Sequence, residues 1–215
     1  MNARAVIVWD LPTRAFHGLL LLLVGAQYAS GEFGWFDLQW HLYAGYATLA
    51  LLLFRIVWGF IGSDSARFSA FLRGPATIFA YLRGTHAEAA THNPLGGWSV
   101  LLMMTVLLAM SLAGLASSDD IDVFGPLVAT LDEASVRFAT RWHHRLADAL
   151  LWLIALHVAA VLWQEWRGSR LVGAMLHGRR TLDAAAPRIV SNTRAVVVLL
   201  LSAAAIYALL YWASR

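Results

Sequence analysis

Five stretches of the chain stay apolar for close to the length that a helix needs to cross a bilayer, which is about 20 residues. Polar or charged connections separate them, and no internal repeat relates them. Apolar runs of this length are typical of transmembrane helices. The predicted spans are Leu11–Ala29, Trp40–Phe60, Trp98–Ala116, His143–Gln164 and Ala195–Trp212.

The first stretch is the shortest in strictly apolar residues, and it allows two interpretations. Arg4 ahead of the run LLLLLVGA, with small residues after it, is also the pattern of a cleaved signal peptide. A signal peptide has a featureless apolar region, whereas this one is crowded by Asp10, Pro12, Arg14 and His17. Because Asp10 and Pro12 suit the start of a helix, we interpret the stretch as a retained span.

The bulk composition is that of a membrane protein. Of the 215 residues, 60% are hydrophobic and 13% are charged, whereas soluble domains average about 25% charged residues. The chain has no cysteine, which excludes disulfides, thiolate metal sites and covalent haem attachment through a C-x-x-C-H motif. The formal net charge of +3 is modest, so it informs topology and predicts no nucleic-acid partner.

Charge divides the connections into two kinds. The loops Ile61–Gly97 and Glu165–Asn192 carry three and five arginines, whereas Ser117–Arg141 carries five carboxylates and two arginines. Because loops rich in arginine stay in the cytoplasm, we expect the N-terminus and both arginine-rich loops there. The acidic loop, the short connection Ser30–Gln39 and the C-terminus then face the other side. In a bacterium this predicts a multi-pass protein of the inner (cytoplasmic) membrane with a periplasmic C-terminus.

The first arginine-rich loop contains two recognisable segments. Within it, SARFSAFLRGPATIFAYLRG mixes aromatic and arginine residues at helical spacing, which predicts one or two short helices in the headgroup region. The segment THNPLGGW, which contains His92, is expected to be a turn leading into the third span. A contact of His92 with a quinone or a haem propionate is the alternative for that residue.

Five of the eight histidines fall within or at the ends of predicted spans, and they define four positions because the neighbours His143 and His144 count as one. Ionisable side chains are costly there and by default suggest function, although an imidazole near a helix end is also an ordinary interfacial anchor. The predicted topology sorts the four into two layers. His17 and His157 lie toward the cytoplasm, whereas His41 and one of the neighbours His143 and His144 lie toward the periplasm.

Two neutral imidazoles at one depth, on different helices of a bundle, suit the axial ligation of a b haem. Two haems would use all four span histidines. Zinc is a poorer interpretation, because two histidines per layer leave a tetrahedral site incomplete. A proton relay would want carboxylates within the spans, and the candidate is Asp148, one turn beyond His144.

The spacing within RWHHRLADALLWLIALH favours His143 over His144 as the ligand. At about 100° per residue, fourteen positions bring His143 to within roughly 40° of His157 on the helix face, whereas His144 lies about 140° away. Both haems must face the bundle interior, so His144 is expected to point to the interface or to a propionate. Fourteen residues rise roughly 21 Å, most of a hydrocarbon core about 30 Å thick.

Glycines and arginines near the two layers fit this interpretation. Gly18 adjoins His17 and Gly45 lies one turn after His41, where bare backbone could accept a flat porphyrin. Glycines are also common wherever membrane helices pack closely. Four arginines could pair with haem propionates through two parallel hydrogen bonds, or could be ordinary interfacial residues. They are Arg14, Arg55, Arg141 and Arg145.

Four stretches together resemble the bacterial cytochrome b-561 family, in the variant grouped with hydrogenase-type cytochrome b subunits. They are VWDLPTRAFHG, HLYAGYATLALLLFRIVWGFIGSDSARF, HNPLGGW and WHHRLADALLWLIALHVAAV, and the similarity covers most of residues 6–180. The resemblance implies an all-α integral membrane fold, in which a four-helix transmembrane bundle holds two b haems. The implied axial ligands are His17 and His157 for the cytoplasmic-side iron, and His41 and His143 for the periplasmic-side iron.

The resemblance also divides the chain. Residues 1–190 are expected to form the di-haem four-helix domain, with a cytoplasmic interfacial loop at about 61–97. Residues 191–215 add a fifth, C-terminal transmembrane helix outside the resemblance, which could contact a partner subunit or a second copy, or anchor the C-terminus. The first-helix motif departs from the family as well, which often has His-Trp where this chain has His17-Gly18.

The leading functional hypothesis is transmembrane electron transfer between the quinone pool, ubiquinone or menaquinone, and a periplasmic partner. That partner is superoxide or a redox protein such as a c-type cytochrome, and a homodimer in the lipid membrane is a further expectation. A membrane-anchor cytochrome b subunit of a hydrogenase or another dehydrogenase is the alternative. A haem-free transporter or proton relay, and a scaffold for a partner enzyme, are alternatives of other classes.

No side chain is expected to act as an acid–base catalyst, because the haem carries the redox chemistry. The acidic cluster Asp119–Asp122 would repel superoxide and attract a basic partner, whereas Arg137, Arg141 and Arg145 would do the reverse. The charges of this loop therefore leave the choice of periplasmic partner open.

Overall fold

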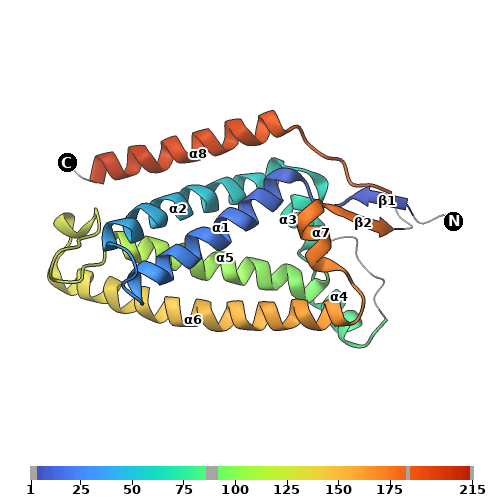
Figure 1. Ribbon diagram of the computed structural model, residues 1–215, viewed down its shortest axis with the longest axis horizontal. Coiled ribbons are helices and arrows are strands. Elements are labelled where there is room, and N and C mark those ends of the chain that lie inside the picture. Colours follow the sequence, from blue (N-terminus) through green and yellow to red (C-terminus); the bar gives the residue numbers. More distant parts are fainter. Residues whose placement is uncertain (1–3, 86–91, 183–184, 214–215) are drawn as a thin grey trace.

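Five long helices dominate the computed structural model, which describes residues 4–85, 92–182 and 185–213 (Figure 1). Each coincides with one predicted span to within a few residues, except that α6 begins at Glu133, well before His143. The all-α membrane fold expected from the sequence is confirmed. The helices are α1 (Leu11–Gly31), α2 (Leu38–Ile61), α5 (Pro94–Leu115), α6 (Glu133–Trp166) and α8 (Asn192–Ala213).

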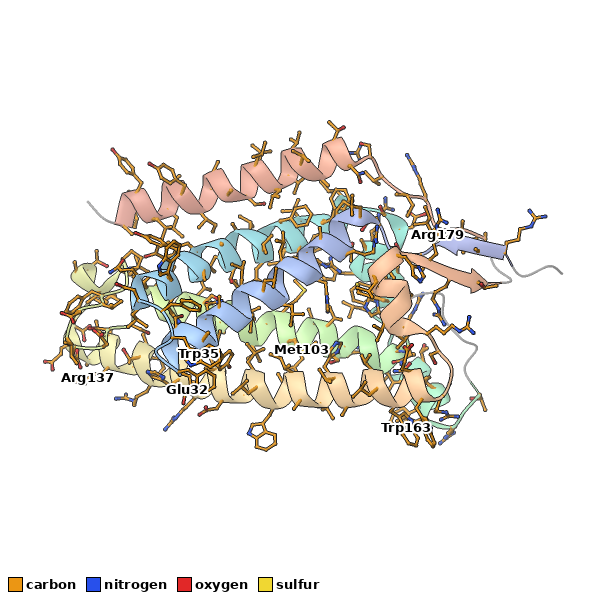
Figure 2. The ribbon with its side chains drawn as sticks, viewed as in Figure 1. Glu32, Trp35, Met103, Arg137, Trp163 and Arg179 are labelled. Atoms are coloured by element: carbon orange, nitrogen blue, oxygen red, sulfur yellow. The ribbon has the colours of Figure 1, made fainter. Side chains whose placement is uncertain are left out.

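Four of these helices, α2, α5, α6 and α8, are long and apolar enough to cross a membrane by length and composition. Helix α1 has 21 residues and packs along α2, but polar residues such as His17 and Gln27 make it less apolar than the others. Exposed tryptophans lie near both ends of the bundle, including Trp35 and Trp163 (Figure 2). Such aromatic belts are typical of the two membrane–water interfaces.

The helices pack as two pairs, α1 with α2 and α5 with α6, which are joined by contacts between α2 and α5. Helix α8 lies along α2 on the outside, so α8 and α6 form opposite edges of the bundle (Figure 1). Helices α1 and α6 meet through side chains rather than through close backbone contact: the Tyr28 hydroxyl donates a hydrogen bond to the Ala147 carbonyl at 2.6 Å. Leu20 and Val24 of α1 also pack against the buried cluster that includes Leu150 of α6.

Side-chain caps set where the bundle helices begin. Asp10 accepts a hydrogen bond from the backbone N–H of Thr13 at the start of α1, and Asn93 accepts one from Gly96 at the start of α5. Asp37 and Asp132 play the same part for α2 and α6. Each cap satisfies one of the free N–H groups of a first helical turn. The polar residues that bound the apolar runs thus fix the ends of the helices.

One end of the bundle, here called the hairpin end, carries most of the short elements. Around it lie η1 (Asp64–Ala66), α3 (Phe68–Phe71), α4 (Pro75–Leu82) and α7 (Leu171–His177), so the predicted short helices of the first loop are present. Two strands were not predicted: β1 (Arg4–Ile7) pairs antiparallel with β2 (Arg179–Leu182). Four-residue strands so far apart in the chain leave no periodic signal in the sequence.

A single glycine, Gly178, connects α7 to β2. Gly178 has φ 80°, and its carbonyl accepts hydrogen bonds from the backbone N–H groups of Val8 and Trp9 at 2.8 and 3.1 Å. A Cβ at this position would lie 2.7 Å from the Trp9 carbonyl oxygen. A side chain is therefore excluded where the N-terminal strand meets the segment after α7.

The opposite end, here called the acidic-loop end, holds the connection between α5 and α6. Glu32 and Arg137 lie at this end, whereas Arg179 lies at the hairpin end (Figure 2). Within the loop, Asp119 Oδ1 accepts three backbone N–H groups, from Ile121, Asp122 and Val123. The N–H of Val123, followed by the others, holds the pKa of Asp119 below its usual range. This carboxylate therefore shapes the loop that carries it.

An apolar layer fills the middle of the bundle. Leu52 of α2, Leu107 and Met110 of α5 and Leu150 of α6 form one buried cluster, and each is at most 5% exposed. Leu150 lies seven residues from both His143 and His157 on α6. The layer thus separates the two ends at which the span histidines are found.

Candidate functional site

At the acidic-loop end, the structure brings the rings of His41 of α2 and His143 of α6 together in a T-shaped arrangement. Their ring centroids are 6.0 Å apart and their planes are inclined by 74°. With metal–imidazole bonds of about 2 Å, two rings on opposite sides of one metal have centroids roughly 6 Å apart. The separation of the pair therefore matches two axial ligands of one iron.

Hydrogen bonds orient both rings through the same nitrogen. His41 Nδ1 lies 3.0 Å from the Gln27 carbonyl oxygen, and His143 Nδ1 lies 2.9 Å from the Met110 carbonyl oxygen. A carbonyl can only accept, so Nδ1 donates in each case and Nε2 keeps its lone pair. Metal-binding histidines usually donate their second nitrogen in this way. The pair is thus prepared to bind a metal through both Nε2 atoms.

A cavity of about 260 Å³ adjoins the two rings. It is bounded by α1, α2, α5 and α6, and its lining is more apolar than polar. Two glycines that the sequence did not single out lie against the rings. A Cβ on Gly31 would lie 2.9 Å from His41 Nδ1, and one on Gly114 would lie 3.1 Å from the His143 ring. Bare backbone at both positions makes room for the imidazoles themselves.

Gly18 and Gly45, the two glycines selected from the sequence, have different surroundings from Gly31 and Gly114. A Cβ on Gly45 would meet Gln27 Oε1 at 3.6 Å, and one on Gly18 would meet no atom within 4 Å. Gly45 lines the cavity beside His41, and Gly18 borders open space next to His17. Neither is required by the packing of one helix on another, which leaves the porphyrin interpretation of both open.

His144 occupies the rim of the same cavity. Its ring is exposed and lies 5.8 Å from the ring of His143, whereas His143 is half-buried and hydrogen-bonded. The expectation that His144 points away from the interior agrees with this exposure. Ligation by His143 and not by His144 stays a prediction.

At the hairpin end, His17 of α1 and His157 of α6 lie close enough for their charges to interact. Neither ring makes a hydrogen bond within the described part of the chain, and His17 is exposed. This pair is therefore less fixed by the protein alone than the pair at the acidic-loop end. Among the described residues, no group of three or more metal-ligating side chains is found.

The four arginines chosen as propionate partners have different surroundings. Arg55 is buried, and its guanidinium lies over the rings of Phe68 and Phe71. At the hairpin end, Arg14 donates a hydrogen bond to the Leu176 carbonyl oxygen. Arg141 and Arg145 are exposed, and Arg145 lies over the Trp142 ring at 5.7 Å. Of the four arginines, Arg55 is the one that is buried.

His92 is more enclosed than its place in the sequence suggested. It precedes Asn93, the cap of α5, so it lies in the expected turn into the third span. Its ring contacts those of Trp9 and Phe71, at centroid distances of 4.8 and 4.6 Å. Burial, followed by the charges of Arg55 and His157, lowers the pKa of His92 to about 3. His92 thus lies at the hairpin end, enclosed by aromatic residues from other parts of the chain.

Comparison with known families gives one match. The model of the family described as prokaryotic cytochrome b561 matches residues 8–178, which include α1, α2, α5, α6 and all four span histidines but not α8. No curated protein matches the chain.

Proposed function

Because the chain belongs to the prokaryotic cytochrome b561 family, we propose that it transfers electrons across the membrane through two bis-histidine b haems. The family establishes a multi-pass membrane cytochrome b that binds b-type haem and takes part in electron transfer. The proposal adds the number of haems, their axial ligands and the redox partners. The haem supplies one-electron chemistry at its iron.

The observation that carries the proposal is the pair His41 and His143. Both rings donate Nδ1–H to a backbone carbonyl, and the 6.0 Å between their centroids suits one iron. This arrangement fixes the tautomer that leaves the Nε2 lone pair of each ring available to a metal. We assign His41 and His143 to the haem at the acidic-loop end.

The second haem is assigned to His17 and His157 at the hairpin end. These residues lie on different helices and close enough to interact, and α6 provides one ligand to each haem. The fourteen-residue interval on α6 corresponds to a rise of roughly 21 Å. The buried layer around Leu150 keeps water from the space between the two pairs. Four histidines on three helices thus form an electron path along the bundle.

The distribution of charge supports an orientation and a pair of partners. The hairpin end carries the arginine-rich segments and the acidic-loop end carries Asp119–Asp122, so we place the hairpin end in the cytoplasm and the protein in the bacterial inner membrane. Quinone is the proposed membrane partner. A periplasmic c-type cytochrome or superoxide is the proposed partner at the acidic-loop end.

Three further assignments belong to the same proposal. Arg14 is proposed to contact a propionate at the hairpin end, and Arg141 and Arg145 at the acidic-loop end. Helix α8, outside the matched residues, packs on α2 and offers an exposed face. A partner subunit, as in a hydrogenase or another dehydrogenase, or a second copy of this chain would contact that face.

The test is the visible spectrum of the purified full-length protein, combined with its haem content. We expect low-spin b-haem bands and two haems per chain, and reduction of at least one haem by a quinol analogue. A colourless protein would contradict electron transfer and would favour a haem-free transporter. Two haems that quinol fails to reduce would leave the cytochrome intact and remove quinone as the partner.

A further inference from the structure

Two nitrogen-containing side chains at the hairpin end each have a buried nitrogen without a hydrogen-bond partner among the described residues. Arg55 is 3% exposed, and within the described residues its guanidinium donates no hydrogen bond. His92 has a buried Nδ1 that also lacks a partner. Both groups contact the ring of Phe71. The guanidinium carbon of Arg55 lies 5.9 Å from the centroid of this ring, and the centroid of the His92 ring lies 4.6 Å from it.

No carboxylate of the described chain forms an ion pair or a hydrogen bond with Arg55. Asp10 is close enough for its charge to act on Arg55, but its oxygens accept hydrogen bonds from the backbone of Thr13 and the indole of Trp58 and not from the guanidinium. No ion pair among the described residues includes Arg55. Buried charges in native proteins are nearly always paired. The Arg55–His92 pair therefore indicates an anion that the described residues do not supply.

Spacing along α2 places Arg55 at the depth of the second histidine pair. Arg55 follows His41 by fourteen residues, the same interval that separates His143 from His157 on α6, and the two helices run in the same direction. Fourteen residues return to within roughly 40° of the starting face of a helix. Arg55 therefore lies on nearly the same face of α2 as His41, level with His157.

The position of His92 points to the same place. The charges of both Arg55 and His157 act on it, so it lies near the guanidinium and near a residue assigned to the hairpin-end haem. The anion that such a haem brings is one of its propionate carboxylates. An arginine binds a carboxylate through two parallel N–H groups, and a neutral imidazole adds one more donor.

We propose that Arg55 and His92 together bind one propionate of the haem at the hairpin end. This inference rests on the proposed ligation of that haem by His17 and His157. The rings of Phe71 and Trp9 pack around His92 and keep water from the contact. Both residues act as positioning residues, since they hold the cofactor through its side chain and do not touch the iron.

The proposal has an electrostatic consequence that can be measured. The positive charge of Arg55 offsets the negative propionate near the iron, and in a buried site this compensation is little screened by solvent. Without Arg55 the uncompensated negative charge favours ferric over ferrous iron. The midpoint potential of one haem is then expected to fall, while that of the other stays unchanged.

The experiment is a redox titration of the haem-loaded, full-length protein and its variants. We expect Arg55→Gln to lower one of the two midpoint potentials, Arg55→Lys to lower the same one less, and His92→Phe, which keeps the ring packing, to lower it slightly. Arg73→Gln is the matched control, because Arg73 is an exposed arginine on the same side of the protein. The propionate bending band in the resonance Raman spectrum should change for the same haem.

The outcomes separate this proposal from the proposed function. If Arg55→Gln fails to assemble, Arg55→Lys and His92→Phe decide the matter. Unchanged potentials and an unchanged Raman band in those variants would overturn the proposal, as would an equal shift of both haems. A wild-type protein with fewer than two haems would contradict the proposed function before any variant is made.

Discussion

His143 on α6 donates a hydrogen bond from Nδ1 to the carbonyl oxygen of Met110 on α5, at 2.9 Å. One helix therefore sets the tautomer and the direction of an imidazole carried by its neighbour. The same arrangement recurs between His41 on α2 and Gln27 on α1. For the two predicted ligands at the acidic-loop end, one helix of each pair carries the imidazole and the other orients it.

The first prediction separates His143 from its neighbour. His143→Ala should remove about one of two haems per chain, because it deletes an axial ligand that no nearby oriented imidazole replaces. His144→Ala should keep both haems, since His144 is exposed and its ring makes no hydrogen bond in the described structure. Haem content per chain, measured as the pyridine haemochrome, checks both. Haem loss that follows His144 would show that the helix-face argument is wrong.

A second prediction concerns the room that Gly114 leaves for His143. Gly114→Ala places a methyl group 3.1 Å from two atoms of the His143 ring, closer than ordinary van der Waals contact. We expect the ring to tilt and the haem at the acidic-loop end to be lost or to change its spectrum. Ala109→Val, on an exposed part of the same helix, is the control. An unchanged spectrum in Gly114→Ala would mean that the ring tolerates displacement.

The third prediction tests the apolar layer between the two histidine pairs. Leu150→Ala leaves a cavity in the middle of the bundle, because Leu150 is 2% exposed and packs against α2 and α5. Such truncations cost roughly 2 kcal/mol or more in stability, so the temperature at which the haem bands are lost should fall. Leu151→Ala is matched and should have little effect, since Leu151 is exposed on the bundle surface. Equal effects of the two changes would argue against a packed central layer.

A fourth prediction addresses Asp10 and Trp58. The indole Nε1 of Trp58 donates to Asp10 Oδ2 at 2.9 Å, and both residues are buried. Trp58→Phe leaves that oxygen without a donor, which should cost about 1–3 kcal/mol. Thermal unfolding followed by circular dichroism checks this.

The control for Trp58→Phe is Trp152→Phe. This substitution makes the same change in side-chain size at the surface, because Trp152 is 79% exposed. A Trp58 variant as stable as the Trp152 variant would show that the hydrogen bond contributes nothing to the folded state.

Much of the architecture follows from the order of residues alone. Lipid cannot hydrogen-bond the backbone, so an apolar run of about 20 residues in a membrane must be a helix. The helical period then determines which residues share a face. These two constraints are sufficient to locate α2, α5, α6 and α8 and to separate the histidines into two ends, and they predict His143 rather than His144 as the ligand. The charge of the loops adds an expected orientation.

Tertiary structure alone decided the contacts between residues far apart in the chain. Three kinds of contact depend on how helices and termini meet. They are the hydrogen bonds of His41 and His143 to backbone carbonyls, the approach of Gly31 and Gly114 to those rings, and the pairing of β1 with β2. The position of His92 beside Arg55 is of the same kind. Periodicity describes one element at a time, whereas these contacts arise from the packing of several elements against one another, and no local pattern encodes them.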